Sequence, residues 1–136
     1  MEDPSQVLVD TSVWIEFFRR RDPHFSAVSR LVNDGAVSVI PLIVAELIQG
    51  ARSRKEIHEL KELLAVFPLL EESPDSWIQA GELAFQLKGK GLHPGLADCF
   101  ITVLGTRHSV RLFTLDKHFQ QIRLKTQLSI YQAPSN

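Results

Sequence analysis

Four acidic residues stand in apolar surroundings, where a solvated surface does not put them. Asp10 follows a run of three apolar residues, and Asp116 comes directly after a second apolar run. Glu46 and Asp98 lie inside two stretches that are otherwise almost entirely apolar. An ionised carboxylate in such surroundings is costly unless it is paired or binds a cation. These four residues are therefore the first candidates for a functional site.

Carboxylates gathered in one pocket cannot all stay ionised without a cation, because like charges raise one another's pKa. Mg²⁺ prefers oxygen ligands and needs only a few carboxylates, and Mn²⁺ suits the same ligands. We therefore predict a Mg²⁺ or Mn²⁺ site formed by Asp10, Glu46, Asp98 and Asp116. Taken singly, Asp10 and Asp116 could instead cap helices, and Glu46 or Asp98 could lie on an exposed stripe. The four acids together favour the metal site.

Other chemistries find little support in the sequence. The histidines are His24, His58, His93, His108 and His118. They show no paired ligand spacing, and Cys99 is the only cysteine, so a zinc site is not favoured. The chain also has no glycine-rich phosphate loop and no G-x-S-x-G motif. We interpret Cys99 as a small buried hydrophobic residue.

The apolar pattern alternates between predicted strands and predicted helices. Strands are expected at about 6–10, 37–40, 110–115 and 128–131, and helices at about 12–19, 23–32, 41–50, 57–64, 74–87, 94–107 and just after 116. Trp77, Gly81, Ala84 and Leu87 are expected to share one helix face. Alternation of this kind predicts a single α/β domain with three α/β/α layers, in which helices cover both faces of a central parallel sheet.

This topology should bring the four acids together. The carboxyl ends of parallel strands meet at one edge of a sheet, and ligands bind there. Asp10 and Asp116 are expected at strand ends, and Glu46 in the early turns of the helix that follows the second strand. Asp98 is expected in the first turns of a helix near the same edge. The sequence therefore predicts one acidic pocket.

Length and charge narrow the class of protein. The 136 residues suit one domain over 1–136, with an ordered core of about 6–131 and a short polar C-terminal tail. A formal net charge of −1 argues against a protein that coats nucleic acid through bulk charge. Local basic clusters at 19–21, 52–55 and 88–90 could still line a groove for a phosphate backbone.

The expected cellular location of the protein rests on the absence of membrane and export signals from the sequence. No apolar run approaches the ~20 residues that a membrane-spanning helix needs. Residues 1–4 lack the basic and apolar regions of a signal peptide. A lone cysteine fits a reducing compartment. We therefore expect a cytoplasmic protein without a membrane segment.

Four stretches of the chain, in order, resemble the acidic motifs of PIN-domain ribonucleases: LVDTSVWIEFFR, VAELIQGAR, LADCFITVLG and LFTLDKHFQQI. The resemblance covers essentially the whole chain and is strongest to the VapC toxins of bacterial and archaeal toxin–antitoxin pairs. It implies that Asp10, Glu46, Asp98 and Asp116 are catalytic and hold Mg²⁺ or Mn²⁺. Thr11, Ser12 and Thr114 match hydroxyl positions that support such a site, although capping and turn hydrogen bonds explain them equally well.

The resemblance also implies a function. Such a protein is an endoribonuclease in which bound metal activates water for hydrolysis of phosphodiester bonds in RNA. It would act as a toxin, form a homodimer and bind a cognate VapB-like antitoxin.

Three other kinds of protein are alternatives. A receiver domain needs an acidic pair after the first strand, where only Asp10 stands. An aspartate-nucleophile phosphatase needs a second aspartate at the position of Ser12. The remaining alternative is a non-catalytic PIN-like module that binds nucleic acid in complex with a partner protein.

Overall fold

A parallel sheet lies at the centre of the computed structural model, which describes residues 6–134. Strand β1 (Val7–Val9) pairs in parallel with β2 (Val37–Ser38) and with β3 (Arg111–Phe113). Strand β3 in turn pairs with β4 (Ser129–Ile130), so the strand order is β2-β1-β3-β4. All three residues of β1 are fully buried, which explains its uninterrupted apolar sequence.

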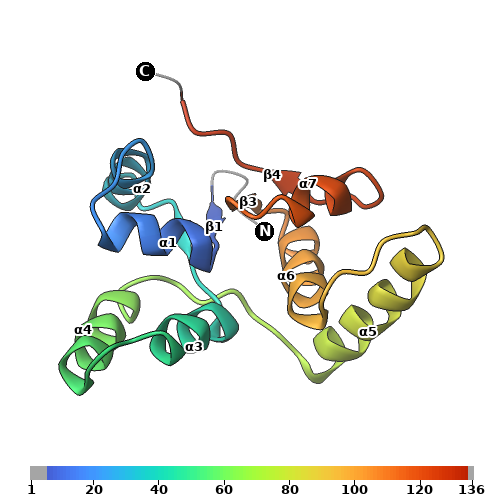
Figure 1. Cartoon of the computed structure of the whole chain (residues 1–136), viewed down its shortest axis with the longest axis horizontal. Coiled ribbons are helices and arrows are strands. Elements are labelled where there is room, and N and C mark those ends of the chain that lie inside the picture. Colours follow the sequence, from blue (N-terminus) through green and yellow to red (C-terminus); the bar gives the residue numbers. More distant parts are fainter. Residues whose placement is uncertain (1–5, 135–136) are drawn as a thin grey trace.

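Helices flank the sheet on both sides. They are α1 (Thr11–Phe18), α2 (His24–Asn33), α3 (Pro41–Gln49), α4 (Arg54–Leu64), α5 (Pro74–Lys88), α6 (Leu96–Arg107) and α7 (His118–Arg123). Figure 1 shows α1 to α4 on one side of the strands and α5 to α7 on the other. The predicted α/β fold with a central parallel sheet between helices is thereby confirmed.

The strands are shorter than the sequence pattern predicts. Strand β1 ends at Val9 and β3 at Phe113, because the chain then turns into the segments that carry the acidic residues. Beyond β2, Val39 forms an isolated parallel bridge with Leu69. The bridge brings the apolar stretch after α4 alongside the β2 edge of the sheet.

The expected face of α5 is only partly correct. Trp77 and Gly81 are exposed, whereas Ser76, Ala80 and Leu87 are buried. The buried residues face α6, to which α5 packs closely. The exposed indole of Trp77 still contributes, because it stacks on Phe100 of α6 with ring centroids 3.8 Å apart.

The buried apolar side chains form one core that includes both central strands and the inner faces of the helices. Trp14 lies within it and contacts the rings of Phe17, Phe18 and Phe67. Cys99 is fully buried in the same core, as predicted.

Some sequence predictions lie outside the described part of the chain. The features expected of residues 1–4 and of the last two residues of the tail belong to this group. Within residues 6–134, no helix combines the length and the apolar character needed to cross a bilayer.

Candidate metal centre

The acidic residues lie at the point of the sheet where the strand order switches from one side of β1 to the other. From β1 the chain passes to β2 on one side, and it later returns to β3 on the other side. In open α/β sheets, the crevice at the carboxyl ends of two such strands is the usual ligand site. Asp10 follows β1 directly, and its backbone N–H donates to the carbonyl of Phe113, the last residue of β3, at 2.9 Å. Asp116 follows β3 in the adjoining loop.

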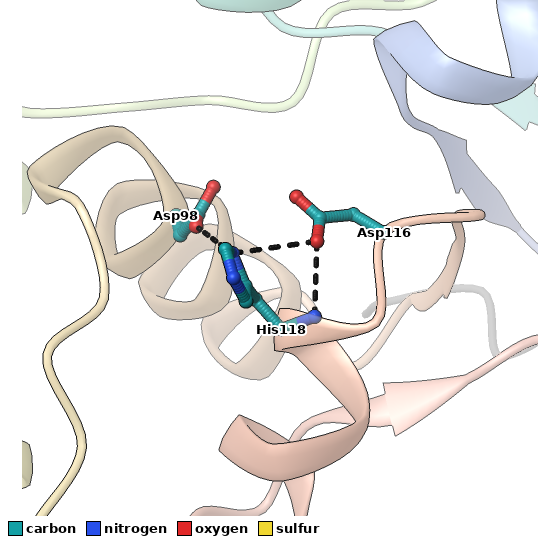
Figure 2. A group of neighbouring side chains, drawn as sticks. All are labelled: Asp98, Asp116 and His118. Carbon is teal, nitrogen blue, oxygen red and sulfur yellow. Dashed lines mark hydrogen bonds and ion pairs between the residues drawn. The ribbon is translucent and has the colours of Figure 1, made fainter.

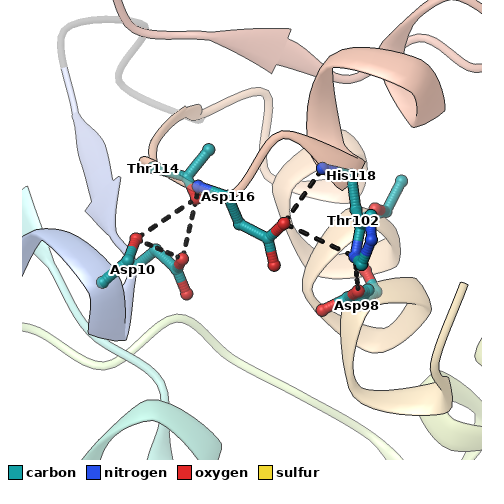
Figure 3. Close-up of polar contacts among 7 residues, drawn as sticks. Asp10, Asp98, Thr102, Thr114, Asp116 and His118 are labelled. Atoms are coloured by element: carbon teal, nitrogen blue, oxygen red, sulfur yellow. Dashed lines mark hydrogen bonds and ion pairs between the residues drawn. The ribbon is translucent and has the colours of Figure 1, made fainter.

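Asp10 is buried, with 6% of its surface exposed, and it precedes α1. Its backbone carbonyl accepts hydrogen bonds from the N–H groups of Val13 and Trp14, but its carboxylate makes no capping bond. Instead, Oδ2 accepts a hydrogen bond from Ser12 Oγ at 2.9 Å. It accepts a second one from Thr114 Oγ1 at 2.7 Å (Figure 3). Helix capping therefore does not explain why an acid stands at this position.

The three predicted hydroxyl residues all contact the acidic site. Thr11 Oγ1 donates to Glu46 Oε1 at 2.9 Å, which joins α1 to α3. Ser12 Oγ accepts from the backbone N–H of Leu115, and Thr114 Oγ1 accepts from that of Asp116, both at 3.0 Å. The hydroxyls therefore make turn hydrogen bonds and also position carboxylates, so the two interpretations of these residues are compatible.

Asp98, Asp116 and His118 form the tightest cluster of possible metal ligands in residues 6–134 (Figure 2). One donor atom from each lies within 4.8 Å of the others. His118 Nδ1 is 3.4 Å from Asp116 Oδ1 and 3.9 Å from Asp98 Oδ2. The backbone N–H of His118 also donates to Asp116 Oδ1 at 2.9 Å, so one oxygen of Asp116 does stabilise the turn before α7.

His118 is the member of this cluster that the sequence interpretation missed. None of the five histidines has paired ligand spacing, so none is predicted as a ligand. The usable signal is the Asp-x-His spacing directly after a predicted strand, which places both side chains at the same edge of the sheet. This local spacing involves one acid and one histidine, so a search for paired histidines does not detect it.

The charges of the acids act on one another. Burial and the carboxylates of the other three acids, Asp116 foremost, together raise the pKa of Asp98 to about 6, whereas His118 opposes the shift. Burial also raises the pKa of Glu46, against the hydrogen bond from Thr11. The carboxylate of Asp10 adds to the shift of Glu46.

The site nevertheless has two parts. Asp98 and Asp116 are in the tight cluster, whereas Asp10 and Glu46 lie outside it and are held by hydroxyls of α1 and of the loop after β3. The carboxylate oxygens suit a hard divalent cation such as Mg²⁺ or Mn²⁺. Such a cation would also remove the repulsion that raises the pKa of Asp98. The donor set therefore fits the metal that the sequence predicts.

A groove of about 670 Å³ lies between α1, α3 and α4 and includes one of the four acids, Glu46, in its lining. Thr11 and Glu46 line one part of it, and the rest is lined largely by apolar residues such as Phe18. Two members of the basic clusters, Arg19 and Arg52, also line the groove, together with two acidic residues of α4, Glu56 and Glu59. The groove therefore combines an apolar wall with charged side chains of both signs and contains one of the four acids, Glu46.

Comparison with known proteins identifies the family of the chain. The model of the PIN domain family matches residues 7–125. Ribonuclease VapC11 from Mycobacterium tuberculosis is 28% identical over 127 residues, which are 90% of this chain and 95% of the relative. Ribonuclease VapC1 from Methanocaldococcus jannaschii is 26% identical over 123 residues, which are 90% of this chain and 85% of the relative.

Solved structures have the same fold. The DNA-bound VapBC structure from Salmonella typhimurium has a TM-score of 0.74 at 17% identity, covering 93% of this chain and 96% of the compared chain. VapBC-1 from nontypeable Haemophilus influenzae has a TM-score of 0.73 at 21% identity, covering 92% and 96%. Because the family model spans most of the sequence and the four acidic motifs meet at one sheet edge, this chain belongs to the PIN-domain family.

Proposed function

We propose that this chain is a Mg²⁺- or Mn²⁺-dependent endoribonuclease that acts in the cytoplasm as the toxin of a toxin–antitoxin pair. The observation that carries the proposal is that Asp10, Glu46, Asp98 and Asp116 lie together at the carboxyl edge of the sheet, where burial and the charges of the other three acids raise the pKa of Asp98. The curated relatives are named as ribonucleases, which supports RNA as the substrate.

The side chains have distinct parts in this proposal. When bound, a divalent cation supplies Lewis-acid activation of water and neutralises charge that develops on the phosphodiester. Asp98 and Asp116 would hold the cation, with Asp10 and Glu46 completing the acidic shell. Ser12 and Thr114 fix the carboxylate of Asp10 before the cation arrives. Because that geometry is already formed, little rearrangement is needed on binding.

The alternative of a non-catalytic PIN-like module that binds nucleic acid is not favoured. All four acids are present, and the hydroxyls around them are hydrogen-bonded in place. A module that only binds an RNA backbone gains nothing from an acidic pocket, because phosphate and carboxylate repel each other.

Cleavage of a structured RNA by the purified protein tests the proposal. We expect cleavage with Mg²⁺ or Mn²⁺, none in excess EDTA and none from Asp98→Asn. The matched control is Asp75→Asn, because Asp75 also lies in the first turn of a helix but is exposed on α5, away from the acids. Cleavage that survives both EDTA and Asp98→Asn contradicts the proposal.

We extend the proposal to a VapB-like antitoxin as partner. Among the solved structures with this fold, VapBC-5 from Mycobacterium tuberculosis is described as a member of a family of toxin–antitoxin systems, and a structure from Klebsiella pneumoniae as a toxin–antitoxin complex. The groove between α1, α3 and α4 offers an apolar surface that ends at Glu46. An arginine from a segment lying there can pair with two carboxylates at once. We expect it to contact Asp10 or Asp98 and displace the cation.

Co-expression with a small gene encoded directly upstream tests this partner. The purified complex should bind Mn²⁺ more weakly than the free chain does. Equal Mn²⁺ affinity in the two would contradict displacement of the cation.

We also expect a homodimer. Ile78 and Phe85 are exposed on one face of α5, seven residues apart, and offer an apolar contact surface. Light scattering should give a dimer mass for the wild type and a monomer mass for Phe85→Glu. A monomeric wild type would contradict this part of the proposal.

A further inference from the structure

We propose that Nδ1 of His118 is a direct ligand of the cation and gives the site a preference for Mn²⁺ over Mg²⁺. This inference rests on the metal dependence proposed above and adds a nitrogen to an otherwise all-carboxylate shell. Figure 2 shows the imidazole ring beside the carboxylates of Asp98 and Asp116, with its nitrogen directed toward them.

The backbone holds His118 in place. It is the first residue of α7, and its N–H donates to Asp116 Oδ1 at 2.9 Å. The next residue, Phe119, is 1% exposed and anchors the start of the helix in the core. The imidazole itself has 69% of its side-chain surface exposed, so a hydrated cation can reach it from solvent. A fixed backbone and an accessible nitrogen are both compatible with a role as a ligand.

The distances suit shared coordination. Adjacent ligands of an octahedral ion with bonds of about 2.1 Å lie roughly 3 Å apart. Nδ1 of His118 is 3.4 Å from Asp116 Oδ1 and 3.9 Å from Asp98 Oδ2. Side-chain shifts of less than about 1 Å would therefore bring these three atoms onto one coordination sphere.

The chemistry of the nitrogen sets the expected selectivity. Carboxylate, carbonyl and water ligands suit Mg²⁺ and Mn²⁺ alike, whereas imidazole suits later transition ions best, and Mn²⁺ has the lowest affinity of the first-row series. We therefore expect an imidazole ligand to favour Mn²⁺ over Mg²⁺ by a modest factor. Mg²⁺ also gives up its bound water reluctantly, so it gains little from an added nitrogen. A His118 that only forms ion pairs with Asp98 and Asp116 would instead leave the metal in an all-oxygen shell.

Pulsed electron paramagnetic resonance of the Mn²⁺-loaded protein tests the inference directly, because it detects nitrogen bound to the ion. We expect a nitrogen hyperfine coupling in the wild type, its loss in His118→Ala and its retention in His58→Ala. The control residue His58 is an exposed histidine of α4 that pairs with Glu62. In calorimetric titrations, His118→Ala should weaken Mn²⁺ binding by at least roughly tenfold, because loss of a group that only supports a ligand already costs about 10–100-fold. Its effect on Mg²⁺ binding should be smaller.

The outcomes separate this inference from the proposed function. If the wild type binds Mn²⁺ more tightly than Asp98→Asn does but shows no nitrogen coupling, the assignment of His118 is wrong and the metal-dependent function stands. If the wild type binds Mn²⁺ no better than Asp98→Asn does, both are overturned. Absence of the coupling from the wild-type spectrum overturns the assignment even if a variant fails to fold.

Discussion

Replacing Asp98 by Asn should make the metal-free protein more stable at neutral pH, although it removes a proposed metal ligand. The physical reason is the raised pKa of this carboxyl, which burial and three neighbouring carboxylates produce together. Asp98 lies in the first turn of α6, where the helix dipole favours a negative charge. Burial and repulsion therefore outweigh the helix terminus, so the ionised form is destabilised in the folded state.

The size of the effect follows from the shift. The pKa of Asp98 rises from 3.8 to about 6. About two units correspond to roughly 3 kcal/mol at about 1.4 kcal/mol per unit. Since 22% of the side chain remains exposed and solvent screens part of the repulsion, we expect roughly 1–2 kcal/mol.

The upward direction of the pKa shift of Asp98 determines the pH range over which the stability of the protein changes. A raised pKa means that the folded state binds more protons than the unfolded state as the pH rises from about 4 to about 6. The free energy of unfolding of the wild type should therefore fall across that window and then level off. The side chain introduced by Asp98→Asn carries no charge to titrate, so the variant should lack this fall.

Urea unfolding in EDTA at about pH 4 and pH 7.5 measures the effect, with the slope against denaturant unchanged. Asp98→Asn should be more stable than wild type at the higher pH, and this advantage should vanish at the lower one. Asp75→Asn, a change in the first turn of α5, should be neutral or destabilising, because an exposed acid there interacts favourably with the helix terminus. An Asp98→Asn protein that is less stable than wild type at pH 7.5 would refute the reasoning.

The remaining predictions concern the other acids and the cation. Asp10→Asn weakens two charge-assisted hydrogen bonds but also removes the repulsion of Asp98 and Glu46, so in the same urea assay its metal-free stability should stay within about 1 kcal/mol of wild type; a larger change would contradict this balance. Millimolar Mn²⁺ should raise the melting temperature of wild type but hardly that of Asp98→Asn, and less as the pH falls below about 6, because protons compete for Asp98. Thr11→Val removes a hydrogen bond that lowers the pKa of Glu46, so that pKa should rise further. As the pH is lowered, the variant should therefore lose RNA cleavage at a higher pH than wild type does; identical pH profiles would contradict this.

Much of the fold follows from local sequence patterns. Val7 to Val9 are apolar on both faces of a strand, which is typical of the middle of a parallel sheet, and β1 is central. Parallel pairing then requires that Asp10 and Asp116 meet at one edge. The first turn of the helix after Gly95 likewise places Asp98 near that edge. Short-range chemistry and one topological rule are sufficient for these residues.

Other features depend on contacts that no local pattern contains. Trp77 has the spacing of a buried residue, but α5 packs on α6 through Ser76 and Ala80. The indole of Trp77 therefore lies at the exposed edge of the contact between the two helices, where it stacks on Phe100. The proposed role of His118 as a metal ligand depends on the distance between the first turn of α6 and the start of α7. That distance is set by packing between segments about twenty residues apart in the sequence.

The two parts of the acidic site differ in how the charge of their carboxylates is stabilised. Asp10 receives two hydroxyl hydrogen bonds, which stabilise its charge without a metal. Asp98 has no comparable side-chain donor among its described hydrogen bonds, and burial together with the repulsion of the neighbouring acids raises its pKa. In the proposed function, a bound cation would relieve the destabilisation of ionised Asp98, so this free energy would add to metal affinity. We infer that a hydroxyl introduced beside Asp98 would stabilise the metal-free protein and weaken its binding of metal, which links the stability of this site to its proposed chemistry.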